Sequence, residues 1–175
     1  MKRVLWLVPA LMLFCATAKA QDVPAWEIYG GYTYARANLG GTAFNLNGGG
    51  ASATENLNDW FGGRVEFNAL GGTVGGVNVA LQTITYGPVF TFRKFTRLTP
   101  FVHLQLGAVH ADQGFLGISE GAWKFAMTGG GGADYALNDR LAVRVQGDYL
   151  MTRFLNMRQD NIQLSAGLVY RIGKK

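Results

Sequence analysis

Apolar and polar residues alternate with a period of two along most of the chain, most clearly near its C-terminal end. Over residues 161–172, an apolar residue at every second position is separated from the next by a small or polar one. A period of two predicts a β-strand, and this pairing of faces suits a strand with lipid on one side and a polar lumen on the other. An amphipathic strand of a soluble sheet has the same pattern, so the rest of the chain has to decide.

The alternation predicts eight strands in all. Besides residues 161–172, strands are expected at residues 25–36, 58–68, 71–79, 82–92, around 102–108, at 122–135 and at 141–151. The glycine-rich segment 71–79 has the weakest pattern. Pro88 cannot donate a ladder hydrogen bond, so a bulge or a local break is expected there.

The segments between these strands differ in length. Residues 37–56, rich in Gly, Asn, Thr and Ala, predict a long loop, as do residues 111–121 and 152–160, whereas residues 93–99 and 136–140 predict short turns. Long loops that alternate with tight turns are typical of outer-membrane barrels. The short connection between residues 79 and 82 is the exception.

The first twenty residues predict a cleaved signal peptide. Lys2 and Arg3 precede an apolar run over residues 4–16, and an A-x-A site ends at Ala20. Residues 21–175 are then expected to form one domain. The only cysteine, Cys15, lies in the signal peptide, so neither a disulfide nor thiol chemistry is expected in the mature chain.

Composition points to a membrane β-protein. Without Lys2, Arg3 and Lys19, the 16 basic residues fall to 13 against 11 acidic ones, and no basic cluster remains that would predict nucleic-acid binding. Charged residues are 15% of the chain, compared with about 25% in soluble domains. Since no later apolar segment is long enough for a spanning helix, a closed barrel is the only way for this chain to cross a bilayer.

Several segments resemble those of a known family. Residues 84–93 (ITYGPVFTFR), 99–109 (TPFVHLQLGAV), 131–135 and 138–141 are similar to the OmpA-like and OmpX-like bacterial outer-membrane barrels. The resemblance covers residues 21–175 and implies an eight-stranded antiparallel up-and-down transmembrane β-barrel in the bacterial outer membrane. It also implies contact with outer-membrane lipids and insertion by the barrel assembly machinery, and a monomer is expected. The spacing of Ser165, Gly167, Tyr170 and Ile172 resembles the family's C-terminal assembly signal.

Charged residues predicted to face the lumen are the main candidate site. They include both signs: Glu27, Arg64, Glu66, His103, Lys124, Asp134, Arg144, Asp148 and Arg171. One interpretation is a network of paired charges that fills the lumen of a small barrel. The other is a narrow pore in which a carboxylate–arginine pair involving Glu27 or Arg144 opens and closes, as the resemblance implies.

Three other functions remain as alternatives. Residues 117–121 match G-x-S-x-G around Ser119, and His103 or His110 could act as a base, so a lipid-modifying outer-membrane enzyme is one hypothesis. A surface protein that binds an extracellular ligand through the loop at residues 37–56 is another. A soluble ligand-binding barrel would place its apolar residues inside. The spacing of His, Cys and carboxylates predicts no metal site, and no cofactor is expected.

Overall fold

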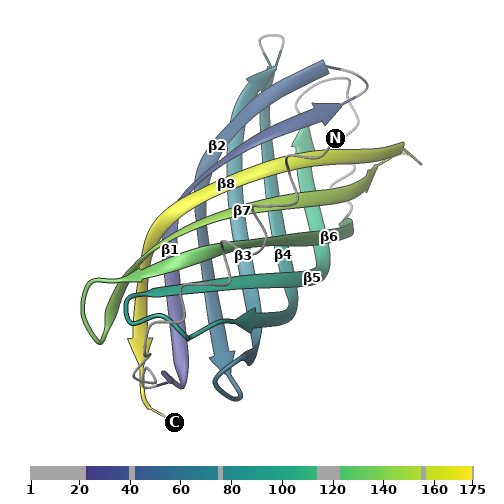
Figure 1. Ribbon diagram of the computed structural model, residues 1–175. Coiled ribbons are helices and arrows are strands. Elements are labelled where there is room, and N and C mark those ends of the chain that lie inside the picture. The colour runs from purple at the N-terminus through teal and green to yellow at the C-terminus, as the bar shows by residue number, and fades with distance from the viewer. Residues whose placement is uncertain (1–22, 40–41, 75–76, 114–122, 155–156, 175) are drawn as a thin grey trace, which may run out of the picture.

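The computed structural model describes residues 23–39, 42–74, 77–113, 123–154 and 157–174. They form a closed barrel in which each strand pairs antiparallel with its neighbours in sequence and β1 pairs with β8 (Figure 1). The predicted fold class is therefore confirmed. Across the described ranges, no helix is long and apolar enough to cross a membrane. The strands are β1 (Trp26–Leu39), β2 (Thr42–Asn56), β3 (Phe61–Val74), β4 (Val77–Thr91), β5 (Leu98–Gln113), β6 (Lys124–Ala136), β7 (Leu141–Phe154) and β8 (Met157–Ile172).

The first and the last strand begin and end at the same end of the barrel. Trp26, which begins β1, lies opposite Ile172, which ends β8. We call this end the termini end; it also carries the connections at residues 57–60, 92–97 and 137–140. The opposite end, where β1, β3, β5 and β7 finish, is called the distal end. Closing β1 on β8 removes both sheet edges, which a bilayer requires because lipid cannot satisfy free backbone groups.

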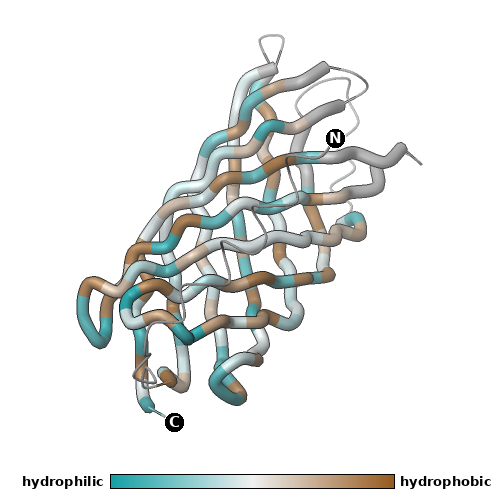
Figure 2. Tube along the Cα trace, in the orientation of Figure 1, coloured by the Kyte–Doolittle hydropathy of each residue, from teal (hydrophilic) through white to brown (hydrophobic). Residues whose placement is uncertain are grey.

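Side chains alternate between the two faces of the barrel as the sequence predicts. Leu164 on the outer face is 55% exposed, whereas its neighbour Gln163 on the inner face is only 2% exposed. Figure 2 shows the resulting alternation of apolar and polar residues along the strands. The large exposed side chains include Ile28, Phe67, Ile84, Leu104, Val145 and Leu168, and the buried ones include many polar residues. An apolar exterior is the reverse of a soluble ligand-binding barrel, and that alternative is wrong.

The prediction of a loop at residues 37–56 is wrong, because most of this segment is β2. Its inner face carries small or polar residues such as Ser52 and Thr54, and its outer face carries Asn47, Gly49 and Ala51. Neither face is apolar, so periodicity gave no signal. The strand forms because β1 and β3 satisfy its backbone groups on both sides.

The predicted strand at residues 71–79 is also wrong. It covers the end of β3 and the beginning of β4, which pair from Phe61 opposite Phe90 to Val74 opposite Val77. The total of eight strands was right only because one missed strand and one extra strand compensated. Loop lengths were overestimated too: β7 ends at Phe154 and β8 begins at Met157, within the predicted loop at 152–160. The predicted loop at 111–121 overlaps β5 up to Gln113, and residues 114–122 lie outside the described ranges.

The local break predicted at Pro88 is confirmed. Pairing between β4 and β5 stops after Tyr86 opposite Leu106 and resumes at Val89 opposite His103. The spacing is three residues on both strands, so the ladder is interrupted without a bulge. Because Pro88 lacks an N–H group, it cannot donate a ladder hydrogen bond, and a local loss of pairing is the effect expected of proline within a sheet.

Candidate functional site in the barrel lumen

Among the residues that the structure describes, eight charged side chains and one histidine are buried inside the barrel, towards the termini end. We call this group the lumen cluster. It contains four carboxylates and four guanidinium groups, and its members are Glu27, Glu66, Asp134, Asp148, Arg64, Arg93, Arg144, Arg171 and His103. The formal charges of the carboxylates and the arginines cancel. All the buried cations are arginines, whose planar group of five donors can bind several acceptors at once.

Arg144 on β7 is the centre of the cluster. Its Nε and Nη2 atoms donate to Asp134 Oδ1 and Oδ2 at 2.7 and 2.8 Å, which is a bidentate pair, and Nη2 also donates to Glu27 Oε2 at 3.2 Å. Arg93 Nη2 donates to the other oxygen of Glu27 at 2.9 Å. Charged hydrogen bonds of this kind are roughly twice as strong as neutral ones. They connect β1, β6 and β7 with the turn after β4.

A second group of contacts surrounds His103. Arg64 Nη1 lies 3.3 Å from His103 Nδ1, and His103 Nε2 lies 3.0 Å from Asp148 Oδ1. Because a guanidinium can only donate, His103 Nδ1 is the acceptor of this hydrogen bond. The contact between His103 Nε2 and Asp148 Oδ1 is close, but it does not have the geometry of a hydrogen bond. Gln146 Nε2 then donates to Asp148 Oδ2 at 3.0 Å and to Glu66 Oε1 at 3.2 Å.

Gly130 on β6 makes room for this group. It lies opposite His103 on β5 and opposite Asp148 on β7. A Cβ atom at Gly130 would collide with the Asp148 carboxylate. The sequence predicts that the glycines at 129–132 leave space for a large side chain from across the barrel. The structure gives that space to side chains from the two neighbouring strands instead.

An aromatic ring packs between the two groups of contacts. The Cζ atoms of Arg64 and Arg144 lie 4.5 and 4.6 Å from the centre of the Phe101 ring. Phe101 is buried and points inwards from β5. Cation–π contacts away from water contribute about 2 kcal/mol each, so Phe101 partly offsets the repulsion between two nearby cations.

The structure brings together most of the predicted charged residues, with two differences. Lys124, the first residue of β6, is half-buried at the distal end, far along the strand from Asp134, and is not part of the cluster. Arg93 is a member, although it was predicted to lie in a short turn at residues 93–99. The inward alternation of Thr83, Thr85 and Thr91 continues to Arg93, and that signal could have revealed it.

The residues of the predicted assembly signal lie near the end of β8. Ser165 is buried on the inner face, while Tyr170 and Ile172 are exposed on the outer face. Gly167 lies opposite Gly31 of β1, in the seam that closes the barrel. Their role in assembly stays a prediction.

The distal half of the lumen contains a cluster of apolar side chains, which the sequence reasoning did not predict. Buried side chains from seven strands meet there; they are Ala35, Ala37, Leu46, Leu70, Leu81, Val109, Ala126 and Leu150. We call this group the apolar layer. Leu46 and Leu150 are each 1% exposed, so the layer is closely packed. The lumen is therefore filled by a charged layer and an apolar layer in succession.

The two histidines lie in different surroundings. His103 contacts Arg64 and Asp148 in the lumen cluster, and the ring of His110 lies 5.3 Å from that of Trp123. Ser119 and the rest of the G-x-S-x-G segment lie outside the described residues. Among the residues that the structure describes, no group of three or more His, Cys, Asp or Glu side chains could hold a metal ion.

The sequence matches the family model described as "Outer membrane protein beta-barrel domain" over residues 6–170, which is nearly the whole chain. The chain belongs to this family of outer-membrane barrels. It is therefore a bacterial outer-membrane protein, as predicted. No curated protein sequence matches it significantly.

Solved structures of other outer-membrane barrels share this fold. Neisserial surface protein A (NspA) matches with a TM-score of 0.73 at 16% identity, over 85% of this chain and 97% of that one. OprG of Pseudomonas aeruginosa matches with a TM-score of 0.61 at 12% identity, over 90% of this chain and 100% of that one. Ail of Yersinia pestis, in complex with the heparin analogue sucrose octasulfate, matches with a TM-score of 0.56 at 19% identity, over 83% of this chain and 97% of that one. At such identities the likeness concerns the fold alone.

Proposed function

We propose that this outer-membrane barrel is neither an enzyme nor a channel, and that it has a structural and surface role. The observation that carries the proposal is the filling of the lumen by two layers in succession. The lumen cluster acts as a structural network of paired charges, and the apolar layer closes the barrel beyond it. Contacts with other molecules are then made by the outer surface and the ends of the barrel.

Each layer opposes the passage of ions for a different reason. An eight-stranded barrel is only wide enough for side chains to fill. An ion at the lumen cluster would have to displace the bidentate pair of Arg144 and Asp134. Beyond it, the apolar side chains of the second layer cannot replace the ion's lost water, and the buried polar side chains beside Leu150 are the uncharged Asn161 and Thr128.

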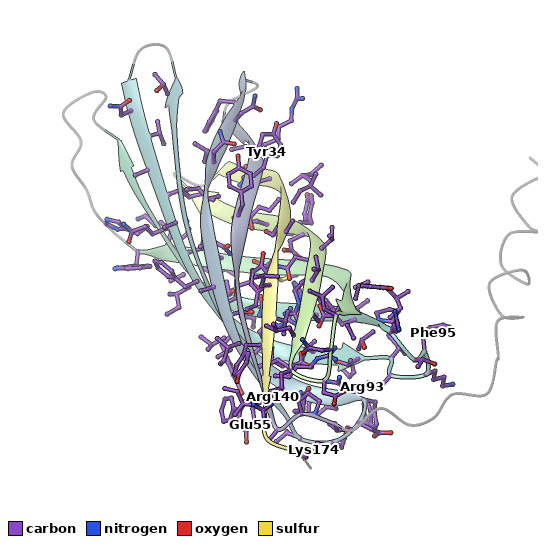
Figure 3. All side chains as sticks on the ribbon, turned by 90° about the vertical axis from the view of Figure 1, so that its left-hand side faces the viewer. Tyr34, Glu55, Arg93, Phe95, Arg140 and Lys174 are labelled. Atoms are coloured by element: carbon purple, nitrogen blue, oxygen red, sulfur yellow. The ribbon has the colours of Figure 1, made fainter. Side chains whose placement is uncertain are left out.

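The length of the strands supports a surface role. The strands have 13 to 16 residues, whereas about 9–11 residues cross a bilayer. The outer face of β1 and β2 becomes polar towards the distal end, where Tyr34 donates to Asn45 Oδ1 at 2.9 Å and Arg36 and Asn47 are exposed. In Figure 3, Tyr34 lies well away from the termini end, which is marked by Lys174. We infer that the termini end faces the periplasm and that this polar distal surface faces outwards.

Conductance of the refolded mature chain in a planar bilayer tests the proposal. Wild type, Arg144→Ala and Asp148→Ala are compared, and a heat-dependent gel shift verifies that each barrel is folded. Wild type and both variants should give no discrete current steps, since the apolar layer stays closed in all three. Steps in folded wild type would overturn the proposal, and a change of those steps in either variant would assign the path to the lumen cluster.

Binding of an extracellular ligand is a second candidate, favoured by Arg36 and the amides beside it on the distal surface. Ail, a barrel of the same fold, was solved with a sulfated sugar. Replacing Arg36, Asn45 and Asn47 together by alanine should weaken the binding of heparin to the refolded barrel, whereas Lys94→Ala in the exposed turn at the termini end should not. Equal binding by both variants would remove this candidate.

A further inference from the structure

A cavity of about 690 Å³ lies at the termini end, between the β4–β5 and β6–β7 turns and the end of β8. Four basic residues and one acidic residue line it; they are Arg97, Arg140, Arg171, Lys174 and Asp139. Figure 3 shows Arg140 and Lys174 at this end of the barrel, with Arg93 nearby. The surplus of positive charge makes the cavity attractive to anions.

Arg171 differs from the arginines at the centre of the lumen cluster. Arg64, Arg93 and Arg144 each donate to a side chain of the cluster, although Nε and Nη1 of Arg93 and Nη1 of Arg144 have no partner among the residues described. Nε and Nη2 of Arg171 have no partner there either, and Arg171, which is only 9% exposed, is the one of the four that lines the cavity. Glu27, which lies opposite Arg171 on β1, already accepts from Arg93 and Arg144. A buried guanidinium with unmet donors is costly unless an acceptor is supplied.

We propose that this cavity is a binding site for a phosphate group, with Arg171 as its buried donor. The planar guanidinium matches the oxygens of a phosphate in a bidentate arrangement, and the cations at the rim add point charges. The volume exceeds what a carboxylate would need and leaves room for the substituent of a phosphate ester. Binding at this site does not require the lumen to be open or closed, so the proposal does not depend on the proposed function.

Two sources could supply the phosphate group: the headgroup of a phospholipid or free phosphate. The turn at residues 138–140 lines both this cavity and a second one of about 470 Å³, which also includes Leu141 and Tyr170. Tyr170 is exposed on the lipid-facing side of β8. The rim of the site is therefore next to the surrounding lipid, and a headgroup could reach it.

Nuclear magnetic resonance of the refolded mature chain in nanodiscs tests the proposal. Inorganic phosphate is titrated into nanodiscs of phosphatidylcholine at constant ionic strength, with chloride as the balancing anion. In parallel, phosphatidylcholine is replaced stepwise by phosphatidylglycerol. The readouts are the Nε–Hε signal of Arg171 and the backbone signals of the turn at 137–140. Saturable shifts with phosphate indicate free phosphate as the ligand, and saturable shifts only with phosphatidylglycerol indicate a headgroup.

Three variants keep the test decisive. Arg171→Gln should weaken the binding about tenfold or more, since one charged hydrogen bond is lost. Arg97 lies in an exposed turn, so its substitution does not put folding at risk, and Arg97→Gln should weaken the binding several-fold. Lys124→Gln makes the same charge change at the distal end and should leave the binding unchanged. The absence of saturable shifts with either probe, or equal weakening by Lys124→Gln and Arg97→Gln, would overturn the proposal.

Discussion

Removing Arg144 tests whether the lumen cluster stabilises the barrel. Arg144→Gln deletes the bidentate pair with Asp134, the bond to Glu27 and the contact with Phe101. Glu27 keeps Arg93, but Asp134 loses the only basic side chain that hydrogen-bonds it among the described residues. Since breaking a buried pair leaves an uncompensated charge, the free energy of unfolding should fall by about 3–5 kcal/mol.

The Asp134→Asn variant completes the comparison. Arg144 then keeps Glu27 and the Phe101 ring, and the amide oxygen of asparagine can still accept one hydrogen bond. The expected loss is about 1.5–3 kcal/mol, the value of one charged hydrogen bond. Because the double variant leaves no unpaired charge at this position, it should be less destabilised than the sum of the single variants, by about 1–3 kcal/mol.

The assay is reversible urea unfolding in lipid vesicles, followed by tryptophan fluorescence and by the heat-dependent gel shift. Arg36→Gln, an exposed arginine on the outer face of β1, controls for the loss of a positive charge and should change the stability by less than about 0.5 kcal/mol. Two results would refute the reasoning. One is an Arg144→Gln barrel as stable as wild type, and the other is a double variant whose loss equals the sum of the single losses.

Three further predictions concern the barrel wall and the second partner of Glu27. Gly167→Ala should slow folding into vesicles and destabilise the folded barrel, because the added Cβ would collide with the backbone of β1. A Cβ at Gly30 would meet nothing within 4 Å, so Gly30→Ala should fold like wild type. Equal folding rates of the two variants would contradict this prediction. Leu164→Arg, on the lipid-facing side, should lower the free energy of unfolding by about 2–4 kcal/mol, whereas Ile172→Arg, near the membrane edge, should lower it by only about 0–1 kcal/mol. Urea titrations measure both losses, and equal losses would contradict this prediction. Arg93→Met should cost about 1.5–3 kcal/mol through the lost bond to Glu27, and an unchanged urea midpoint would place Arg93 outside the cluster.

The sequence was sufficient where a strand is amphipathic over its whole length. In β8, an apolar residue at every second position fixes both the strand and the face that meets lipid, because a shift by one residue would exchange the two faces. For the same reason, inward charges such as Arg64, Asp134 and Arg144 could be predicted one by one. Each lies at an inner position of an otherwise apolar alternation, and an ion is not tolerated on the lipid side.

Prediction from the local sequence pattern failed where a strand is stabilised by pairing with its neighbours. Apart from Phe44 and Leu46 near its distal end, the residues of β2 are small or polar on both faces, so little in their own sequence distinguishes a strand from a loop. They are held as a strand by the backbone hydrogen bonds of β1 and β3. Bilayer immersion favours such a strand strongly, because an unpaired backbone group in lipid costs several kcal/mol.

Sequence alone determined the fold class, the orientation of the side chains in the amphipathic strands and most of the charges that face the lumen. Only the tertiary structure decided which charges meet, because partners such as Arg144 and Glu27 are brought together by barrel closure and are far apart in sequence. It also decided that Arg93 joins the lumen cluster, that Arg171 lines a cavity and that apolar side chains from seven strands meet in the distal lumen. The alternation of a strand specifies a face, whereas contacts across a lumen depend on the register of all eight strands together.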